Sequence, residues 1–368
     1  MLAIARSRPW NSSLGLLLAI GALLAGAGCG GSDSDGDATG LEDVLAAVDG
    51  LDDDARRDRL HELARKEGGT LTFYTSLASA DEEEISNAFE DAYDIEVSVY
   101  RASDEAVSQR LAQEHDASFH GADVVETDGT MLTILNRQSI LAPYEPRARA
   151  RLVAGSSQNG WTADRINTFV IAWNTDRVSA GERPRTWDDL ADPRWRGKVG
   201  LESGDFDWYK GLRDYWIESG RSLEESDRLF EAIARNAVVV TGHSLLLQLL
   251  SAGEIDVIAS AFRSQAESTS REGAPVAWKP PVEPVFTRAG GIAVVRDAPH
   301  PAAALLFCEW LLDEGQKVVA AVGRDPTRQD LTVTKGIEQR IIDVVELADS
   351  QQEWLDRYES LLRLGRQR

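Results

Sequence analysis

Residues 70–101, TLTFYTSLASADEEEISNAFEDAYDIEVSVYR, decide the fold class. The run opens with a β-rich stretch, Thr70–Ser76, and continues with Asp81–Tyr93, in which apolar residues recur at helical spacing and acidic residues fill the first turn. Ile95–Arg101 then alternates apolar and polar residues, which predicts a second strand. A strand, a helix and a strand in succession are typical of a parallel sheet flanked by helices.

The same alternation extends in both directions. Residues 41–66 predict one or two charged helices before the first strand, and a glycine pair ends them. Further strands are predicted at 122–126, 167–173, 198–202, 237–240, 255–261, 275–278 and 290–295. Further helices are predicted at 104–114, 129–137, 203–216, 223–236, 245–252, 301–322, 336–347 and 351–364. The chain therefore predicts two α/β units, with a return to the first unit near its end.

The first 28 residues are typical of a lipoprotein signal peptide. Two arginines precede Leu14–Ala27, an uncharged apolar run that is short for a membrane span. The run ends in small residues directly before Cys29, which resembles the lipobox of bacterial lipoproteins and makes Cys29 the expected lipid attachment site. The alternative is an ordinary secretory leader that happens to contain a cysteine.

The rest of the chain divides into a tether and a body. Residues 29–40 lack large apolar side chains and predict an acidic, flexible tether. The body is long enough for two lobes. We assign 41–165 to the first part of lobe 1, 166–270 to lobe 2, and 271–368 to a return to lobe 1 followed by C-terminal helices.

Composition excludes several classes of function. The formal net charge of −22 repels nucleic acid. Cys308 has no second cysteine to pair with once Cys29 carries lipid, and its apolar helical surroundings favour a buried structural thiol over a reactive one. Residues 242–246, GHSLL, lack the second glycine of a nucleophile elbow, and His61-Glu62 lacks the second histidine of a zinc protease motif. We therefore expect no enzyme, no cofactor and no metal site, with a secreted enzyme as a distant alternative.

Several segments resemble the periplasmic ferric-ion-binding-like group of ABC-transporter substrate-binding proteins. The most specific is residues 184–200, PRTWDDLADPRWRGKVG, and the others are 71–76, 122–128, 251–256 and 272–276. The resemblance implies a two-lobed periplasmic-binding-protein type II fold, with a mostly parallel sheet in each lobe and the ligand in a cleft between them. It also implies an extracytoplasmic solute-binding component of an ABC import system, monomeric, anchored at the outer face of the cytoplasmic membrane, with a permease as its partner.

The resemblance places four segments at the cleft. They contribute the candidate ligand-binding residues Thr75, Ser76, Asp128, Ser203, Gly204, Asp205, Trp208, His243, Ser244 and Arg263. Helix N-termini in such clefts favour anions, because their free N–H groups and the helix dipole point at the ligand.

The ligand types of the ferric-binding members are largely missing here. Ala78 falls where those members place a histidine, and Arg263 and Ser264 fall at their adjacent tyrosine pair, whereas Asp128 preserves a carboxylate. A guanidinium repels a metal ion but grips carboxylate or phosphate. We therefore expect a small anionic solute, with a ferric ion or ferric chelate as the alternative.

Four of these residues keep a structural interpretation open beside the functional one. Asp128 fits a helix N-cap, and Trp208 fits a core position. His243 fits a polar loop residue, and Arg263 fits an ion pair between the lobes or at the surface.

The lipobox interpretation is directly testable. Replacing Cys29 with Ser should release the protein from membranes, because the acylated side chain would be absent. Fractionation of expressing cells measures this, and continued membrane association of the variant would contradict the interpretation.

Overall fold

The computed structural model describes residues 40–366, which belong to one compact unit. The predicted leader (1–28), Cys29 and all of the tether (29–40) except Gly40 lie outside the described residues. Within 40–366, none of the helices has both the length and the apolar character that crossing a bilayer requires.

Lobe 1 is built on a parallel sheet in which β1 pairs with both β2 and β3. Its elements are α1 (Leu41–Ala47), α2 (Asp53–Lys66), β1 (Thr70–Thr75), α3 (Ser79–Tyr93), β2 (Glu96–Arg101), α4 (Asp104–Asp116), β3 (Val124–Asp128), α5 (Gly129–Arg137), η1 (Arg147–Arg151), β4 (Ser157–Gln158), α10 (Pro301–Leu311), α11 (Gln316–Ala321) and η4 (Gln329–Leu331).

Lobe 2 repeats the plan, with β6 parallel to both β7 and β8. Its elements are η2 (Trp187–Ala191), η3 (Pro193–Trp195), β6 (Val199–Glu202), α6 (Phe206–Glu218), α7 (Leu223–Asn236), β7 (Ala237–Val240), α8 (His243–Ala252), β8 (Val257–Phe262), α9 (Arg263–Arg271), β9 (Val276–Ala277) and α12 (Val344–Arg366).

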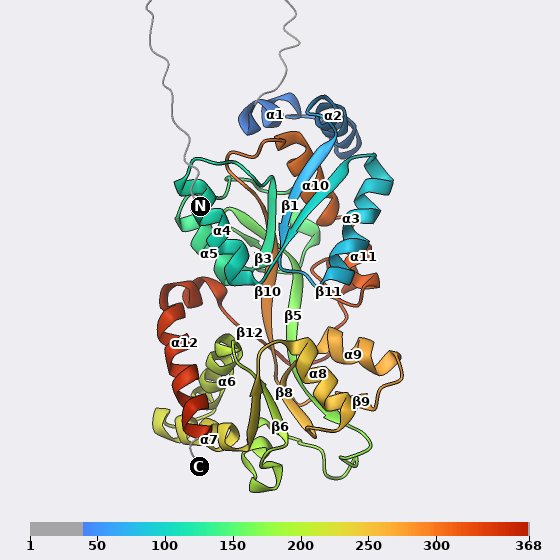
Figure 1. Cartoon of the computed structure of the whole chain (residues 1–368). Helices are drawn as coiled ribbons and strands as arrows, with labels where there is room; N and C mark the ends of the chain where they lie inside the picture. Colours follow the sequence, from blue (N-terminus) through green and yellow to red (C-terminus); the bar gives the residue numbers. More distant parts are fainter. Residues whose placement is uncertain (1–39, 367–368) are drawn as a thin grey trace, which may run out of the picture. The chain divides into compact units, whose positions relative to one another are not determined.

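Two long strands pass through both lobes and join their sheets. β5 (Trp161–Asn174) and β10 (Val285–Val294) pair antiparallel, and the described strands form one sheet in the order β2-β1-β3-β10-β5-β8-β6-β7. The short strands β11 (Asp325–Pro326) and β12 (Gln339–Ile341) pair with β5 and β10 respectively. Figure 1 shows β5 and β10 running between the two groups of helices. The predicted fold class, two mostly parallel α/β lobes joined by crossing segments, is confirmed.

Glycines allow the two crossing strands to approach closely. A Cβ on Gly291 would lie 2.6 Å from the Trp161 ring and 2.7 Å from the Thr162 carbonyl, and one on Gly290 would meet the Arg165 guanidinium. The register of β10 against β5 shifts between these two glycines, as at a β-bulge. The irregularity therefore lies where the chain passes from one lobe to the other.

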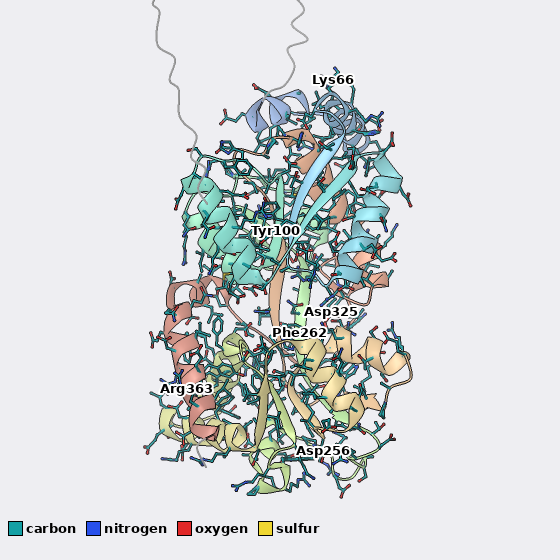
Figure 2. All side chains as sticks on the ribbon, in the orientation of Figure 1. Lys66, Tyr100, Asp256, Phe262, Asp325 and Arg363 are labelled. Carbon is teal, nitrogen blue, oxygen red and sulfur yellow. The ribbon has the colours of Figure 1, made fainter. Side chains whose placement is uncertain are left out.

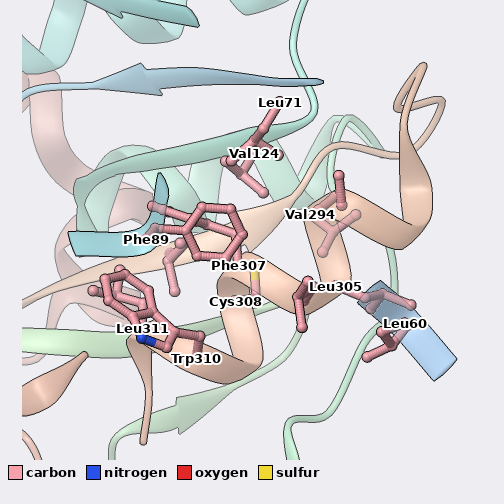
Figure 3. Packing of buried hydrophobic residues seen from close by; sticks show 14 of the residues in the cluster. Leu60, Leu71, Phe89, Val124, Val294, Leu305, Phe307, Cys308, Trp310 and Leu311 are labelled. Carbon is pink, nitrogen blue, oxygen red and sulfur yellow. The ribbon is translucent and has the colours of Figure 1, made fainter. Parts of the chain in front are cut away.

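The core of lobe 1 is an aromatic and aliphatic cluster under α10. Phe307 packs against Phe73, Phe89 and Trp310, with ring centroids 4.9–5.8 Å apart. Figure 3 shows the Cys308 sulfur among these side chains. Burial raises the pKa of the Cys308 thiol, so the interpretation as a structural thiol agrees with its surroundings.

The predicted helix at 301–322 is wrong in one respect, because two helices replace it. α10 ends at Leu311 and α11 begins at Gln316. A Cβ on Gly315 would lie 2.7 Å from the Leu311 Cα, so the chain turns there in very little space. Gln316 is fully buried and donates to the Asp164 carbonyl at 2.8 Å, which ties the start of α11 to β5. The apolar periodicity of the sequence continues across this break, so the pattern predicts one helix where there are two.

The C-terminal prediction also needs correction. Residues 339–341 form β12 rather than a helix, and α12 begins after Asp343, whose carboxylate caps it by accepting from the N–H groups of Val345 and Glu346. α12 then packs on α6 and α7 of lobe 2 and on α5 of lobe 1. Most of its core residues join lobe 2, whereas Val344 at its start joins a core cluster of lobe 1. Figure 1 shows α12 alongside these helices. The segment 332–343 is therefore a third crossing.

The packing predicts that truncation of Phe307 lowers the free energy of unfolding strongly, whereas truncation of Ile341 hardly changes it. Phe307→Ala should lower the free energy of unfolding by about 3–5 kcal/mol, because it empties a fully buried site in the core of lobe 1. Ile341→Ala, at a side chain that is 78% exposed, should change it by less than about 0.5 kcal/mol. Chemical denaturation measures both, and equal losses would contradict the described packing.

Candidate functional site

Buried charges gather where the strands of both lobes end beside β5 and β10. They come from β3, the start of β5, the residue before α6, α6, α9, β10 and β11, and they are Glu126, Asp128, Arg165, Asp205, Asp207, Arg263, Arg288 and Asp325, with the half-buried Asp104 of α4 beside them. Figure 2 labels Phe262 and Asp325 in this region. We name Asp104, Asp128, Asp205, Asp207 and Arg288 the crossing cluster.

Arg288 is the centre of the crossing cluster. It stands on β10, and its Nη1 lies 2.7 Å from Asp128 of lobe 1 and 2.9 Å from Asp207 of lobe 2. Its guanidinium also lies 5.7 Å and 6.0 Å from the ring centroids of Phe169 and Phe262. One cation on a crossing strand therefore links carboxylates from both lobes.

Burial and mutual repulsion set the protonation of these groups. Burial raises the pKa of Asp207 to about 6 against the opposing effect of Arg288, and Asp205 and Asp128 add smaller contributions in the same direction as burial. Burial and Asp104 likewise raise the pKa of Asp128. Although burial lowers the pKa of Arg288, the four carboxylates raise it above its ordinary value. The cluster thus holds more negative charge than its single guanidinium balances.

Asp205 precedes α6 and faces the start of α8 in lobe 2. Its Oδ1 lies 3.2 Å from Nε2 of His243, the first residue of α8. The His243 ring stacks on Phe262 with centroids 3.8 Å apart. The other Asp205 oxygen, Oδ2, is buried and has no hydrogen-bond partner among the described residues.

A second carboxylate of lobe 2, that of Glu202, binds backbone amides in the segment where an anion was expected to bind. Glu202 accepts from the N–H groups of Gly204 and Gly242, the latter at 2.8 Å. Ser203 and Thr241 share a hydroxyl hydrogen bond of 2.8 Å. Burial and Asp205 raise the pKa of Glu202. The predicted anion seat at 203–205 is therefore lined by the protein's own acidic groups.

Arg263 is paired in this structure. Its guanidinium, 6% exposed at the start of α9, bonds to the Asp325 carboxylate and to the Gly323 carbonyl at 3.0 Å. Thr168 donates to the second oxygen of Asp325 at 2.6 Å. The ion pair between the lobes, which was one of the interpretations left open for Arg263, is thus present. Ser244, the second residue of α8, is exposed.

The lobe 1 residues lie at the end of β1. Thr75 donates to Glu126 at 2.5 Å, and Glu126 pairs with Arg165 of β5. Burial raises the pKa of Asp104, but Arg288 and the hydroxyls of Ser76 and Thr127 bring it below its ordinary value.

Asp128 and Trp208 also have structural roles. Asp128 caps α5 by accepting from the Thr130 N–H at 2.7 Å, while its other oxygen meets Arg288, so the N-cap interpretation is confirmed and ligand binding by this residue stays a prediction. Trp208 does not line the cluster. It is fully buried between Trp187 and Phe230 in the core of lobe 2, because it lies on the face of α6 that packs on α7. The prediction that Trp208 contacts ligand is corrected.

Sequence reasoning did not select Arg288, Arg165, Asp104, Asp207 or Asp325. A detectable signal existed for the two arginines, since each is a cation within a mostly buried strand. Arg288 and Asp325 also line a cavity of about 690 Å³, together with Ile166 and the segments 153–158 and 332–345. This volume is in the range of small-molecule sites.

The sequence profile of the bacterial extracellular solute-binding proteins matches residues 74–318. The chain belongs to this family. The match covers residues of both lobes, including β5 and β10, and ends within α11.

Individual relatives are more distant. The Fe(3+)-binding periplasmic protein of Serratia marcescens is 22% identical over 165 residues, which cover 44% of this chain and 48% of that protein. The match thus spans about half the length of that relative. Among solved structures, iron-bound HitA of Pseudomonas aeruginosa is 21% identical with a TM-score of 0.68, over 79% of this chain and 99% of that one. AfuA of Actinobacillus pleuropneumoniae, with fructose-6-phosphate bound, is 19% identical with a TM-score of 0.69, over 80% of this chain and 99% of that one. At these identities the structures establish the fold alone.

The position of Arg288 predicts a pH-dependent loss of stability in its variant. Arg288→Met should lower the free energy of unfolding by roughly 3–5 kcal/mol at pH 8, because Asp128 and Asp207 are left buried and ionised without a partner. A carboxyl whose pKa is raised stabilises the folded state at acid pH and loses that contribution as the pH rises through its folded pKa, about 6 for Asp207. The loss should therefore shrink between pH 8 and pH 5.

Denaturant titration across this pH range measures the effect. Arg177→Met is the matched control: Arg177 pairs with Asp256 but its side chain is 47% exposed, so the change should cost less than about 1 kcal/mol at either pH. A loss for Arg288→Met that does not vary with pH would contradict the charge assignment.

Proposed function

We propose that this protein is the solute-binding component of an ABC import system. It captures a small solute between lobes 1 and 2 outside the cytoplasm and delivers it to a membrane permease. Family membership supports a binding role rather than catalysis, and we set the enzyme alternative aside.

The observation that carries the proposal is the salt bridge of Arg288 to both lobes. Because Asp128 belongs to lobe 1 and Asp207 to lobe 2, any solute that contacts this cluster contacts both lobes at once. Such a solute binds the closed arrangement more tightly than an open one, and this differential affinity drives closure. The permease would then recognise the closed form.

The crossing strands provide the hinge for this motion. β5 and β10 are continuous through both lobes, and their register shifts at Gly290 and Gly291 beside the cluster. A hinge needs only a few residues that absorb the change in backbone angles, and a bulge at paired glycines suits that role.

The groups from which an anionic solute was predicted already have partners within the protein. Asp325 already neutralises Arg263, and Glu202 already accepts the backbone amides of Gly204 and Gly242 in the region where an anion was expected. The ferric alternative is supported by the printed function of the Serratia relative. Against it, no group of three or more His, Cys, Asp or Glu side chains within 40–366 is placed to hold a metal ion.

We also propose that Cys29 carries a lipid that holds the protein, as a monomer, at the outer face of the cytoplasmic membrane. The lipobox-like run before Cys29 supports this placement, and the acidic segment that follows would serve as the tether.

A ligand screen tests the proposed function. The protein is unfolded and refolded to remove any bound solute, and its thermal transition is followed against sugars, sugar phosphates, dicarboxylates, amino acids, amines and ferric citrate. A ligand at 1,000-fold its Kd should stabilise by about 4 kcal/mol, a shift on the order of 10 °C. Small-angle scattering should show a smaller radius of gyration with the same compound. If no compound raises the transition or compacts the protein, the proposed function is wrong.

A further inference from the structure

Three helices begin at the crossing cluster, and each supplies carboxylates to it. Asp128 accepts from a backbone N–H in the first turn of α5 at 2.7 Å, and Asp207 accepts from one in α6 at 2.7 Å. Asp104, the first residue of α4, accepts the N–H of Asp128 at 3.1 Å. The amides and helix dipoles that would hold an anion are therefore already compensated by the protein's own negative groups.

The crossing cluster is also unbalanced in charge. Asp104, Asp128, Asp205 and Asp207 all act electrostatically on Arg288, the one guanidinium among them. Four carboxylates against one cation leave a formal charge of −3 when all are ionised. Burial of such an excess is unfavourable unless a positive charge joins it.

Three carboxylate oxygens of the cluster lack a hydrogen bond among the described residues, and two of them, on Asp128 and Asp207, face Arg288. The third, Oδ2 of Asp205, has no cation beside it within 40–366 and marks where positive charge is missing. Asp205 is 3% exposed, and its Oδ2 has no donor among the described residues, although its Oδ1 faces His243. A buried acceptor without a donor is costly, so a ligand that brings N–H groups to it is favoured. This orphaned oxygen is independent of the charge count and points to the same chemistry.

From this we infer that the solute carries a protonated amine, which enters the crossing cluster and donates hydrogen bonds to Asp205. The inference rests on the proposed solute-binding function and names the class of its substrate: a small organic ammonium compound.

An organic ammonium group fits better than a metal ion. The Arg288 guanidinium already lies between Asp128 and Asp207, so those oxygens cannot converge on a cation without displacing it. An ammonium needs only one or two carboxylate acceptors and tolerates a neighbouring guanidinium that is itself paired. Phe262, which stacks on His243 beside Asp205, offers an apolar surface for the carbon chain.

Matched compounds test this inference on the whole protein, after the refolding that removes bound solute. The panel holds aliphatic diamines, ω-amino acids, ω-hydroxy acids and dicarboxylates, each with chains of three to six carbons, together with sugars, sugar phosphates and ferric citrate. We expect a diamine or an amino acid to bind by isothermal calorimetry, and its hydroxy analogue to bind at least 100-fold more weakly.

Variants assign the effect to Asp205. Asp205→Asn keeps the size of the side chain and removes its charge, and it should weaken amine binding on the order of 100-fold. Asp91→Asn makes the same chemical change at an exposed position of α3 and should leave affinity within twofold. The unliganded transition of each variant shows whether it folds.

The pH dependence of the unaltered protein gives a second test that needs no variant. Asp207 faces Arg288, Asp128 and Asp205, and burial raises its pKa to about 6. Tyr358 of α12 lies in the field of Asp207 but stays neutral, because burial raises its pKa well above the usual range. As the pH falls from 7.5 to 5, Asp207 gains a proton and the cluster loses negative charge. Amine affinity should therefore fall, whereas a dicarboxylate would bind more tightly.

The outcomes separate the inference from the proposed function. Binding of an amine that weakens both at pH 5 and in Asp205→Asn supports the inference. Binding of only dicarboxylates, sugars, sugar phosphates or ferric citrate overturns it and leaves the solute-binding function standing. Binding of no compound in the panel counts against both.

Discussion

The antiparallel pairing of β5 with β10 passes through both hydrophobic cores of the described chain. Phe169 of β5 and Phe286 of β10 are fully buried in lobe 2, while Trp161 and Ile292 on the same strands are buried in lobe 1. The pairing brings the strand ends of the two parallel sheets together and sets the charged groups of the crossing cluster beside one another. The position of the site is therefore a consequence of the strand order.

A site beside the crossing strands requires charged groups to be buried. Most of the ionised groups beside the crossing strands have partners: Arg263 pairs with Asp325, Arg165 with Glu126, and Arg324 with Asp81. Paired charges of this kind add little net stability, because desolvation offsets their attraction. The crossing cluster differs, since its carboxylates outnumber its cations. An imbalance kept in a buried place is typical of a binding site rather than of a scaffold.

The sequence predicted the regular elements well where local chemistry specifies them. α7 has the bounds predicted for it, 223–236, because Ser222 and Glu225 form a capping box and the helix ends where the β-rich run 237–240 begins. The break between α10 and α11 was missed because it depends on Gly315 and on a buried glutamine that bonds to another strand. Likewise, β12 forms because β10 is there to pair with it.

The candidate site was less predictable than the fold. Asp128, Asp205 and His243 lie at or just after the ends of strands, and these ends can be predicted from the sequence. Their partner Arg288 is distant in the chain and becomes relevant only once β10 lies beside β3 and β5. The expected sign of the ligand charge came from Arg263 considered alone. Asp325, the partner of Arg263, lies on a two-residue strand that no sequence pattern predicts.

The third crossing has a consequence for how this protein could be rearranged. Because α12 completes the core of lobe 2 while α10 and α11 complete that of lobe 1, neither lobe is a continuous piece of chain. A gene fragment ending near residue 270 would encode lobe 2 without the helix that covers α6 and α7. Recombination between relatives would therefore have to exchange two separate segments at once to transfer either lobe intact. The two lobes are thus not genetically modular.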